Sequence, residues 1–152
     1  MSRSLKIRLV LVLTATLLAA CSGEVEDTRP GQPVKTRQAA FKEFIKSFEP
    51  MGVMLRNKRY DADKFLALAT ELHAQRNAPW THFGPETNYP PTKATAEVWK
   101  QPADFENEQK AFLAATETLL SAAQSKDEKQ AASAHKALYE RCQSCHKTYK
   151  TR

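Results

Sequence analysis

Apolar residues recur at intervals of three and four along four long stretches of this chain, and this spacing constrains the fold more than any other feature. It predicts amphipathic helices over about 34–56, 62–75, 102–124 and 126–150. The alternating pattern typical of a strand is absent from the sequence. The length of 152 residues is enough for one domain. We therefore predict an all-α fold, an antiparallel four-helix bundle made by residues 34–152.

Residues that favour the start of a helix stand at three of these boundaries. Asp61 is placed to cap the second helix, and Pro102 suits the first turn of the third. Ser125 and Glu128 have the spacing of a capping box, which predicts that the fourth helix begins just after Ser125.

The connection between the second and third helices, residues 77–101, is long and holds four prolines, so it cannot be one helix. It also carries four large aromatic residues: Trp80, Phe83, Tyr89 and Trp99. A loop of this length and character is seldom without a role, and we expect it to cover one end of the bundle.

The first twenty residues have the form of an export signal. A basic start precedes an apolar run, 9–20, that is too short to span a bilayer. The run ends in Leu-Ala-Ala-Cys, which resembles the bacterial lipobox and implies that Cys21 is lipidated and becomes the first residue of the mature chain. The alternative is an ordinary signal peptide in which Cys21 is incidental.

The segment 21–33 follows as a polar stretch with Gly and Pro, and we predict that it is a flexible tether. The protein is then expected on the periplasmic side of a bacterial membrane, held by its N-terminal lipid, or free in the periplasm if Cys21 is unmodified.

The charge of the chain argues against a nucleic-acid partner. The whole sequence carries a net charge of +6, but residues 1–20 contain three basic and no acidic residues. The mature chain keeps 20 basic and 17 acidic residues, a net +3. This excess is too small to bind a phosphate backbone strongly.

A Cys-x-x-Cys-His run near the C-terminus carries the chemistry: Cys142, Cys145 and His146. This pattern is typical of c-type haem attachment. Two thiols three positions apart lie near one another on a helix and can add to the two vinyl groups along one side of a porphyrin. The histidine that follows can then direct its imidazole at the iron. We predict one covalently bound haem c, attached through Cys142 and Cys145, with His146 as the axial ligand.

Three other readings of the cysteine pair fit less well. A redox-active pair is expected near the start of a helix in a βαβ setting, whereas this pair stands at the end of the last helix. A zinc site requires about four ligands, and the folded part has no third cysteine. A disulfide would close a very short loop and would make no use of His146.

The position of this run, on the last helix of a predicted bundle, resembles cytochrome c′, the class II c-type cytochromes. The resemblance extends over residues 34–152. Its further motifs are Arg37-Gln38, the stretch from Pro79-Trp80 to Phe83-Gly84-Pro85, Glu97-Val98-Trp99, and Tyr149-Lys150. It implies that Arg37 and Gln38 lie near the haem propionates and that Lys150 lies on the proximal side. It also implies electron transfer with redox partner proteins, binding of NO and CO, and frequent pairing into homodimers.

The sixth iron ligand divides this family. Low-spin members resemble this chain but have a methionine four residues after the arginine that matches Arg37, and Phe41 stands there instead. The resemblance therefore implies a five-coordinate, high-spin haem with Phe41 over its open face. Five other donors are predicted to lie too far away, in the core or on the surface: Met51, Met54, His73, His82 and His135.

Two further functions are weighed against a gas-binding and redox protein. One is a six-coordinate, low-spin electron carrier. The other is an enzyme, but the sequence offers no acid–base constellation beside the predicted open face, so we predict that the protein is not an enzyme.

Overall fold

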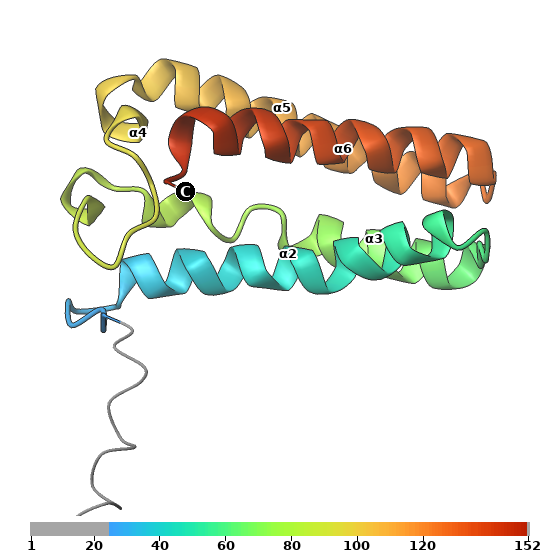
Figure 1. The fold of residues 1–152 in the computed structure, drawn as a ribbon, viewed down its shortest axis with the longest axis horizontal. Coiled ribbons are helices and arrows are strands. Elements are labelled where there is room, and N and C mark those ends of the chain that lie inside the picture. Colours follow the sequence, from blue (N-terminus) through green and yellow to red (C-terminus); the bar gives the residue numbers. More distant parts are fainter. Residues whose placement is uncertain (1–24, 152) are drawn as a thin grey trace, which may run out of the picture.

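Four long antiparallel helices form the protein, as the apolar spacing predicts. The computed structural model describes residues 25–151. The long helices are α2 (Pro33–Arg56), α3 (Ala62–Gln75), α5 (Pro102–Gln124) and α6 (Glu128–Tyr149). Consecutive helices run in opposite directions along one bundle (Figure 1). Within the described residues, none of the helices combines the length and the apolar character needed to cross a membrane.

The observed N-caps confirm one prediction from the sequence and contradict another. The Asp61 carboxylate accepts a hydrogen bond from the Lys64 N–H at 3.0 Å, as expected of an N-cap. The predicted capping box of Ser125 and Glu128 is wrong. Ser125 ends α5, and Asp127 caps α6 instead by accepting from the Gln130 N–H at 2.8 Å. The reason is a turn at Lys126, whose φ of 57° is outside the helical range and delays the start of α6.

The core is a continuous cluster of apolar side chains from all four helices. Its fully buried large members are Met51, Phe65, Leu72, Leu119 and Leu138. Helices α2 and α6 approach closely where the Phe48 ring stacks on His135 at a centroid distance of 4.1 Å. Gly52 faces the same imidazole, and a Cβ at this position would lie 3.1 Å from His135 Cε1. A larger residue here would require the His135 ring to shift by a few tenths of an ångström.

The long loop covers one end of the bundle. It contains two turns of 3₁₀ helix, η2 (Trp80–His82) and η3 (Pro85–Thr87), and the short helix α4 (Glu97–Lys100). The loop is fastened to the end of α6 by two backbone hydrogen bonds, from the Thr95 N–H to the Tyr149 carbonyl and from the Thr151 N–H to the Lys93 carbonyl. The C-terminal end of α6 and the N-terminal end of α2 lie at this same end of the molecule (Figure 1).

The predicted tether is not free along its whole length, and this corrects the sequence expectation for residues 27–33. Asp27 is 1% exposed, and its carboxylate accepts from the backbone N–H groups of Val34 and Lys35 at 2.9 and 3.1 Å. It thereby caps α2 from six residues before the first helical residue, Pro33, whereas the N-cap residue itself, Gln32, makes no side-chain cap. The predicted signal segment and Cys21 lie outside the described residues.

Hydrogen bonding lowers the pKa of Asp27 below its ordinary value. Burial alone would raise it, but the Tyr89 hydroxyl and the backbone N–H groups of Lys35, Arg29 and Val34 favour the charged form and outweigh that effect. A carboxyl group whose pKa is lower in the folded chain stabilises the fold above its unfolded pKa, and this stability is lost as the pH falls.

We therefore expect Asp27→Asn to lower the melting temperature at pH 7 and to lose this effect in acid. The gap between wild type and variant should narrow as the pH falls below about 4, where the wild-type carboxyl becomes protonated. Thermal unfolding between neutral and acidic pH measures this, with the exposed neighbour substitution Glu26→Gln as the control. A gap that stays constant with pH would contradict the role of the charge.

Candidate haem site

The Cys-x-x-Cys-His run lies in the last two turns of α6, entirely within the helix. The side chains of Cys142 and Cys145 are half-buried and are not joined to each other in a disulfide. His146 follows directly and is exposed. The helix therefore presents both sulfur atoms toward the bundle, one turn apart, with the imidazole beside them.

Burial shifts the pKa values of all three side chains of the run. Burial raises the pKa of the Cys142 thiol to about 11, and burial followed by the charge of Glu108 raises that of Cys145 to about 12. Before haem is attached, both sulfurs therefore carry their protons at neutral pH, and a thiol can add its sulfur and hydrogen across a vinyl double bond. Burial, followed by the charge of Lys150, lowers the pKa of His146, which favours the neutral imidazole that ligates iron.

The donors fit a haem better than a bare metal ion. Across residues 25–151, no three side chains of His, Cys, Asp or Glu come together in a group that could hold a metal ion. A zinc site would need about four such ligands gathered in space, whereas the run contains only three candidate donors in sequence, and the fold does not gather them into such a group. A porphyrin brings four nitrogen ligands of its own, so two thiols and one imidazole suffice.

Phe41 lies in a cluster of aromatic rings at the same end of the bundle. Its ring is half-buried and meets those of Phe44, Trp80 and Phe83 edge-on, at centroid distances of 5.7, 5.5 and 6.3 Å. Phe105 continues the cluster from Phe83, and its own ring lies 5.2 Å from that of Tyr149, three residues after His146. The long loop thus brings Phe41 of α2 into one apolar region with the end of α6.

An apolar hollow borders this cluster, with a volume of about 410 Å³. It is lined by Phe83, Pro85, Val98, Trp99, Pro102 and Phe105. The one polar atom of the Trp99 ring, Nε1, donates to the carbonyls of Phe83 and Gly84, so the ring offers only carbon to the hollow.

The two residues predicted near the haem propionates are bonded to the loop. Arg37 is 3% exposed. Its Nη1 donates to the His82 carbonyl and the Thr87 hydroxyl, both at 2.8 Å, and its Nη2 donates to the Thr87 carbonyl at 3.1 Å and the Thr92 hydroxyl at 2.6 Å. Gln38 donates to the Pro91 carbonyl at 3.1 Å. The structure thus gives both a role in holding the loop, while the propionate contacts stay a prediction.

We expect Arg37→Leu to destabilise the protein strongly. The substitution keeps most of the volume but leaves the buried hydroxyl and carbonyl of Thr87, and the partly buried acceptors of Thr92 and His82, without their donor. Unpaired buried polar groups cost about 1–3 kcal/mol each, so we expect a loss on the order of 3 kcal/mol in unfolding free energy. Denaturant unfolding measures this, with the exposed Lys42→Leu on the same helix as the control. Equal stability of the two variants would contradict the role given to Arg37.

The other candidate iron donors have different environments. Met51 and Met54 are buried in the core. The His135 ring stacks on Phe48, with Nε2 3.2 Å from the Phe48 carbonyl. His73 is half-buried rather than on the surface, and its Nε2 lies 2.8 Å from Glu117 Oε2. His82 is also half-buried, which again differs from the expectation.

The sequence did not point to Glu108, which α5 places beside the run. Its Oε1 accepts from the Ser144 hydroxyl at 3.1 Å, whereas its Oε2 is buried with no hydrogen-bond partner among the described residues. No local pattern could have revealed this, because the two residues are 36 positions apart. Lys150, predicted on the proximal side, follows the last residue of α6, and its charge contributes to the lowered pKa of His146.

Comparison with known proteins decides the family. The family model described as "Cytochrome C'" matches residues 32–150. The chain belongs to the cytochrome c′ family. Cytochrome c′ from Alcaligenes xylosoxydans xylosoxydans is 29% identical over 123 residues, which is 80% of this chain and 95% of that protein. The sequence resemblance to this family is thereby confirmed, as is the all-α fold.

Solved cytochrome c′ structures have the same architecture. The protein from Shewanella frigidimarina is 30% identical with a TM-score of 0.78, covering 84% of this chain and all of that one. The protein from Rubrivivax gelatinosus is 28% identical with a TM-score of 0.76, covering 82% and 99%. A nitric oxide complex of a mutant from Alcaligenes xylosoxidans is 29% identical with a TM-score of 0.77, covering 84% and 100%. As a cytochrome c′, the chain is a c-type haem protein with one covalently attached haem.

Proposed function

We propose that this cytochrome c′ holds a five-coordinate, high-spin haem that binds NO and CO and exchanges electrons with a redox partner protein. In this proposal Cys142 and Cys145 fix the porphyrin edge, and His146 is the only protein ligand to the iron. The bound haem supplies a metal centre that can take a diatomic ligand or change its charge by one electron.

The position of Phe41 carries the proposal. Its ring lies among other aromatic rings and offers no donor atom to an iron beside it. The nearest methionines along α2, Met51 and Met54, follow ten and thirteen residues later, about 15–20 Å along the axis at 1.5 Å per residue. Both methionine side chains are also buried in the core. A sixth iron ligand from α2 would require a side chain with a donor atom at position 41, and Phe41 has none.

The apolar surroundings favour some gases over others. Bound dioxygen is polar and is stabilised by a hydrogen-bond donor, which the rings of Phe41, Phe44 and Phe83 cannot supply. NO and CO form less polar complexes and depend less on such a donor. A relative has been solved as its nitric oxide complex, which supports NO as a ligand here.

Titration of the ferrous protein with carbon monoxide tests this proposal. We expect the absorption spectrum to change and to saturate at one CO per chain, while dioxygen forms no stable complex. A low-spin spectrum that CO leaves unchanged would favour the six-coordinate electron carrier and would reject the open face beside Phe41.

We further propose that the mature chain begins at a lipidated Cys21 on the periplasmic side of a bacterial membrane. The apolar run that ends at this cysteine supports the lipid anchor. Mass spectrometry of the mature protein tests it, and an unmodified N-terminus elsewhere than Cys21 would overturn it. Pairing of two chains, implied by the family resemblance, stays a prediction.

A further inference from the structure

A compact set of contacts, which we call the clasp, joins the N-terminal segment to the long loop. The clasp consists of Asp27, Arg29, Glu86 and Tyr89. The Tyr89 hydroxyl donates to Asp27 Oδ1 at 2.7 Å, the Arg29 guanidinium lies 4.0 Å from the Tyr89 ring centroid, and Arg29 Nη1 donates to the Glu86 carbonyl at 3.1 Å. Together with the cap that Asp27 gives to α2, these contacts fix the point from which the chain runs toward its N-terminus.

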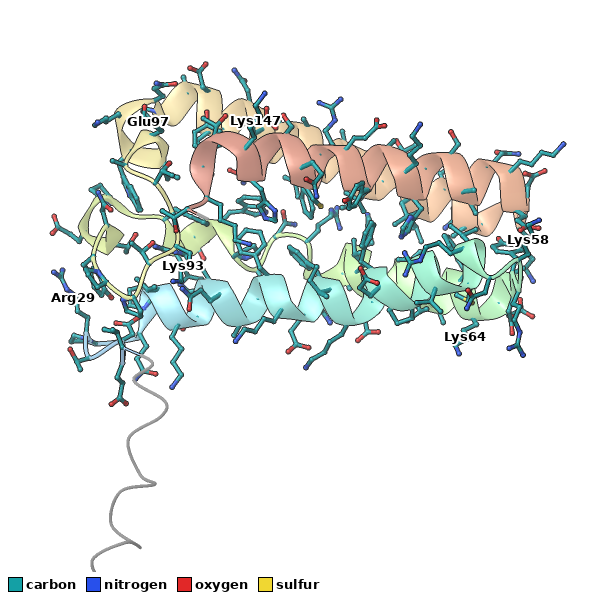
Figure 2. All side chains as sticks on the ribbon, in the orientation of Figure 1. Arg29, Lys58, Lys64, Lys93, Glu97 and Lys147 are labelled. Carbon is teal, nitrogen blue, oxygen red and sulfur yellow. The ribbon has the colours of Figure 1, made fainter. Side chains whose placement is uncertain are left out.

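The clasp lies at the end of the bundle that carries the haem-binding run. The loop that contains Tyr89 continues to Thr95, whose N–H bonds the Tyr149 carbonyl three residues after His146. Arg37 bonds the same loop from α2. Figure 2 shows Arg29 and Glu97 at this end of the molecule, with Lys58 and Lys64 at the opposite end.

The chain between Cys21 and the clasp is short. The two positions are six residues apart, so a fully extended chain reaches at most about 20 Å. Without the clasp, the chain would be free as far as Val34, thirteen residues from Cys21, and could reach about 45 Å. Phe41 lies seven residues into α2 from Val34, about 10 Å along the axis. The clasp therefore shortens the distance over which the haem-bearing end can move from an anchored Cys21.

We propose that the clasp holds the haem-bearing end of the bundle at the surface of the lipid bilayer. The inference rests on the proposed lipid anchor at Cys21. The partner of this end is the lipid surface, and the anchor, not charge, keeps the protein there. Exposed basic and acidic residues are mixed around the clasp, so they give it no strong charge of one sign: Glu26, Arg29, Lys35, Glu86 and Lys93. The opposite end of the bundle, near Lys58, remains free to turn away from the membrane. Exchange of electrons at the haem-bearing end then takes place at the membrane surface.

Energy transfer between labelled lipids and the haem tests the position of this end. The lipidated, haem-loaded full chain is added to phosphatidylcholine vesicles with a small share of lipid labelled at its headgroup by a fluorophore whose emission overlaps haem absorption. We expect strong quenching by the wild-type protein. A Gly/Ser insert of about twelve residues between Glu26 and Asp27 leaves the clasp intact but raises the average reach between Cys21 and Asp27 from about 13 Å to about 23 Å. Because energy transfer falls steeply with distance, we expect quenching to drop.

A second variant separates the clasp from the length of the chain. Asp27→Ala removes the acceptor for Tyr89 and for the start of α2, and it should lower quenching without any insert. Glu26→Ala changes the exposed acidic neighbour and should leave quenching at the wild-type level. Vesicles that fail to retain the wild-type chain would overturn the anchor and this inference together. Retained protein whose quenching is the same with and without the insert would overturn this inference alone and leave the anchor and the gas-binding haem standing.

Discussion

Replacing both Cys142 and Cys145 by serine should abolish covalent haem binding. Serine preserves the size and the helix, but its hydroxyl does not add to a vinyl group as a thiol does. We expect the purified variant to lose its haem on denaturation, whereas the wild-type chain keeps it. The measurement is the mass of the denatured protein, which should carry the increment of one haem in the wild type and none in the variant.

A substitution inside the same run provides the control. Gln143→Ala lies between the two cysteines on the exposed side of α6 and should retain one haem per chain. Retention of covalent haem by the double serine variant would contradict the assignment of the thioethers. A chain that retains haem after only one cysteine is replaced would agree with it, because one thioether remains.

Substitution of Phe41 by methionine should convert the iron from five- to six-coordinate. A thioether at this position of α2 would meet the open face, and the other rings around it supply no competing donor. We expect a low-spin absorption spectrum with a methionine–iron band. If methionine is bound in about 99% of molecules, the apparent affinity for CO falls about 100-fold, because CO binds only the open fraction.

Phe48→Met is the matched control for this change. Phe48 lies seven residues further along the same helix and packs on His135 in the core. About 10 Å of helix separates the two positions, so this methionine should leave the spin state and the CO affinity unchanged. A high-spin spectrum from Phe41→Met, identical to that of the wild type, would mean that Phe41 does not lie over the iron.

The helices could be predicted because their signals are local and repeat along the chain. Apolar residues three and four apart must bury one face, so the positions of α2, α3, α5 and α6 follow from the spacing alone. Signals from single residues were less secure. Ser125 and Glu128 have the right spacing for a capping box, but the turn at Lys126 moves the start of α6 past Ser125.

The candidate site shows the same contrast between features that the local sequence reveals and features that depend on the fold. Cys142, Cys145 and His146 are neighbours in sequence and on one helix, so their chemistry is visible without a structure. Long-range contacts are not. The sequence places Asp27 in a polar tether, because nothing local shows that Tyr89, 62 positions away, donates to it.

Arg37, which belongs to one of the motifs of the family resemblance, illustrates the same limit. Its chemistry suits a propionate, but it also suits the carbonyls and hydroxyls of a loop. Only the folded chain shows that the hydroxyl and carbonyl of Thr87, 50 positions away, accept hydrogen bonds from this guanidinium.

Electron paramagnetic resonance of the ferric wild-type protein tests the five-coordinate haem most directly. We expect a high-spin signal at neutral pH, since His146 binds one face of the iron and Phe41 offers nothing to the other. A purely low-spin signal, with a second axial ligand from the protein, would contradict this.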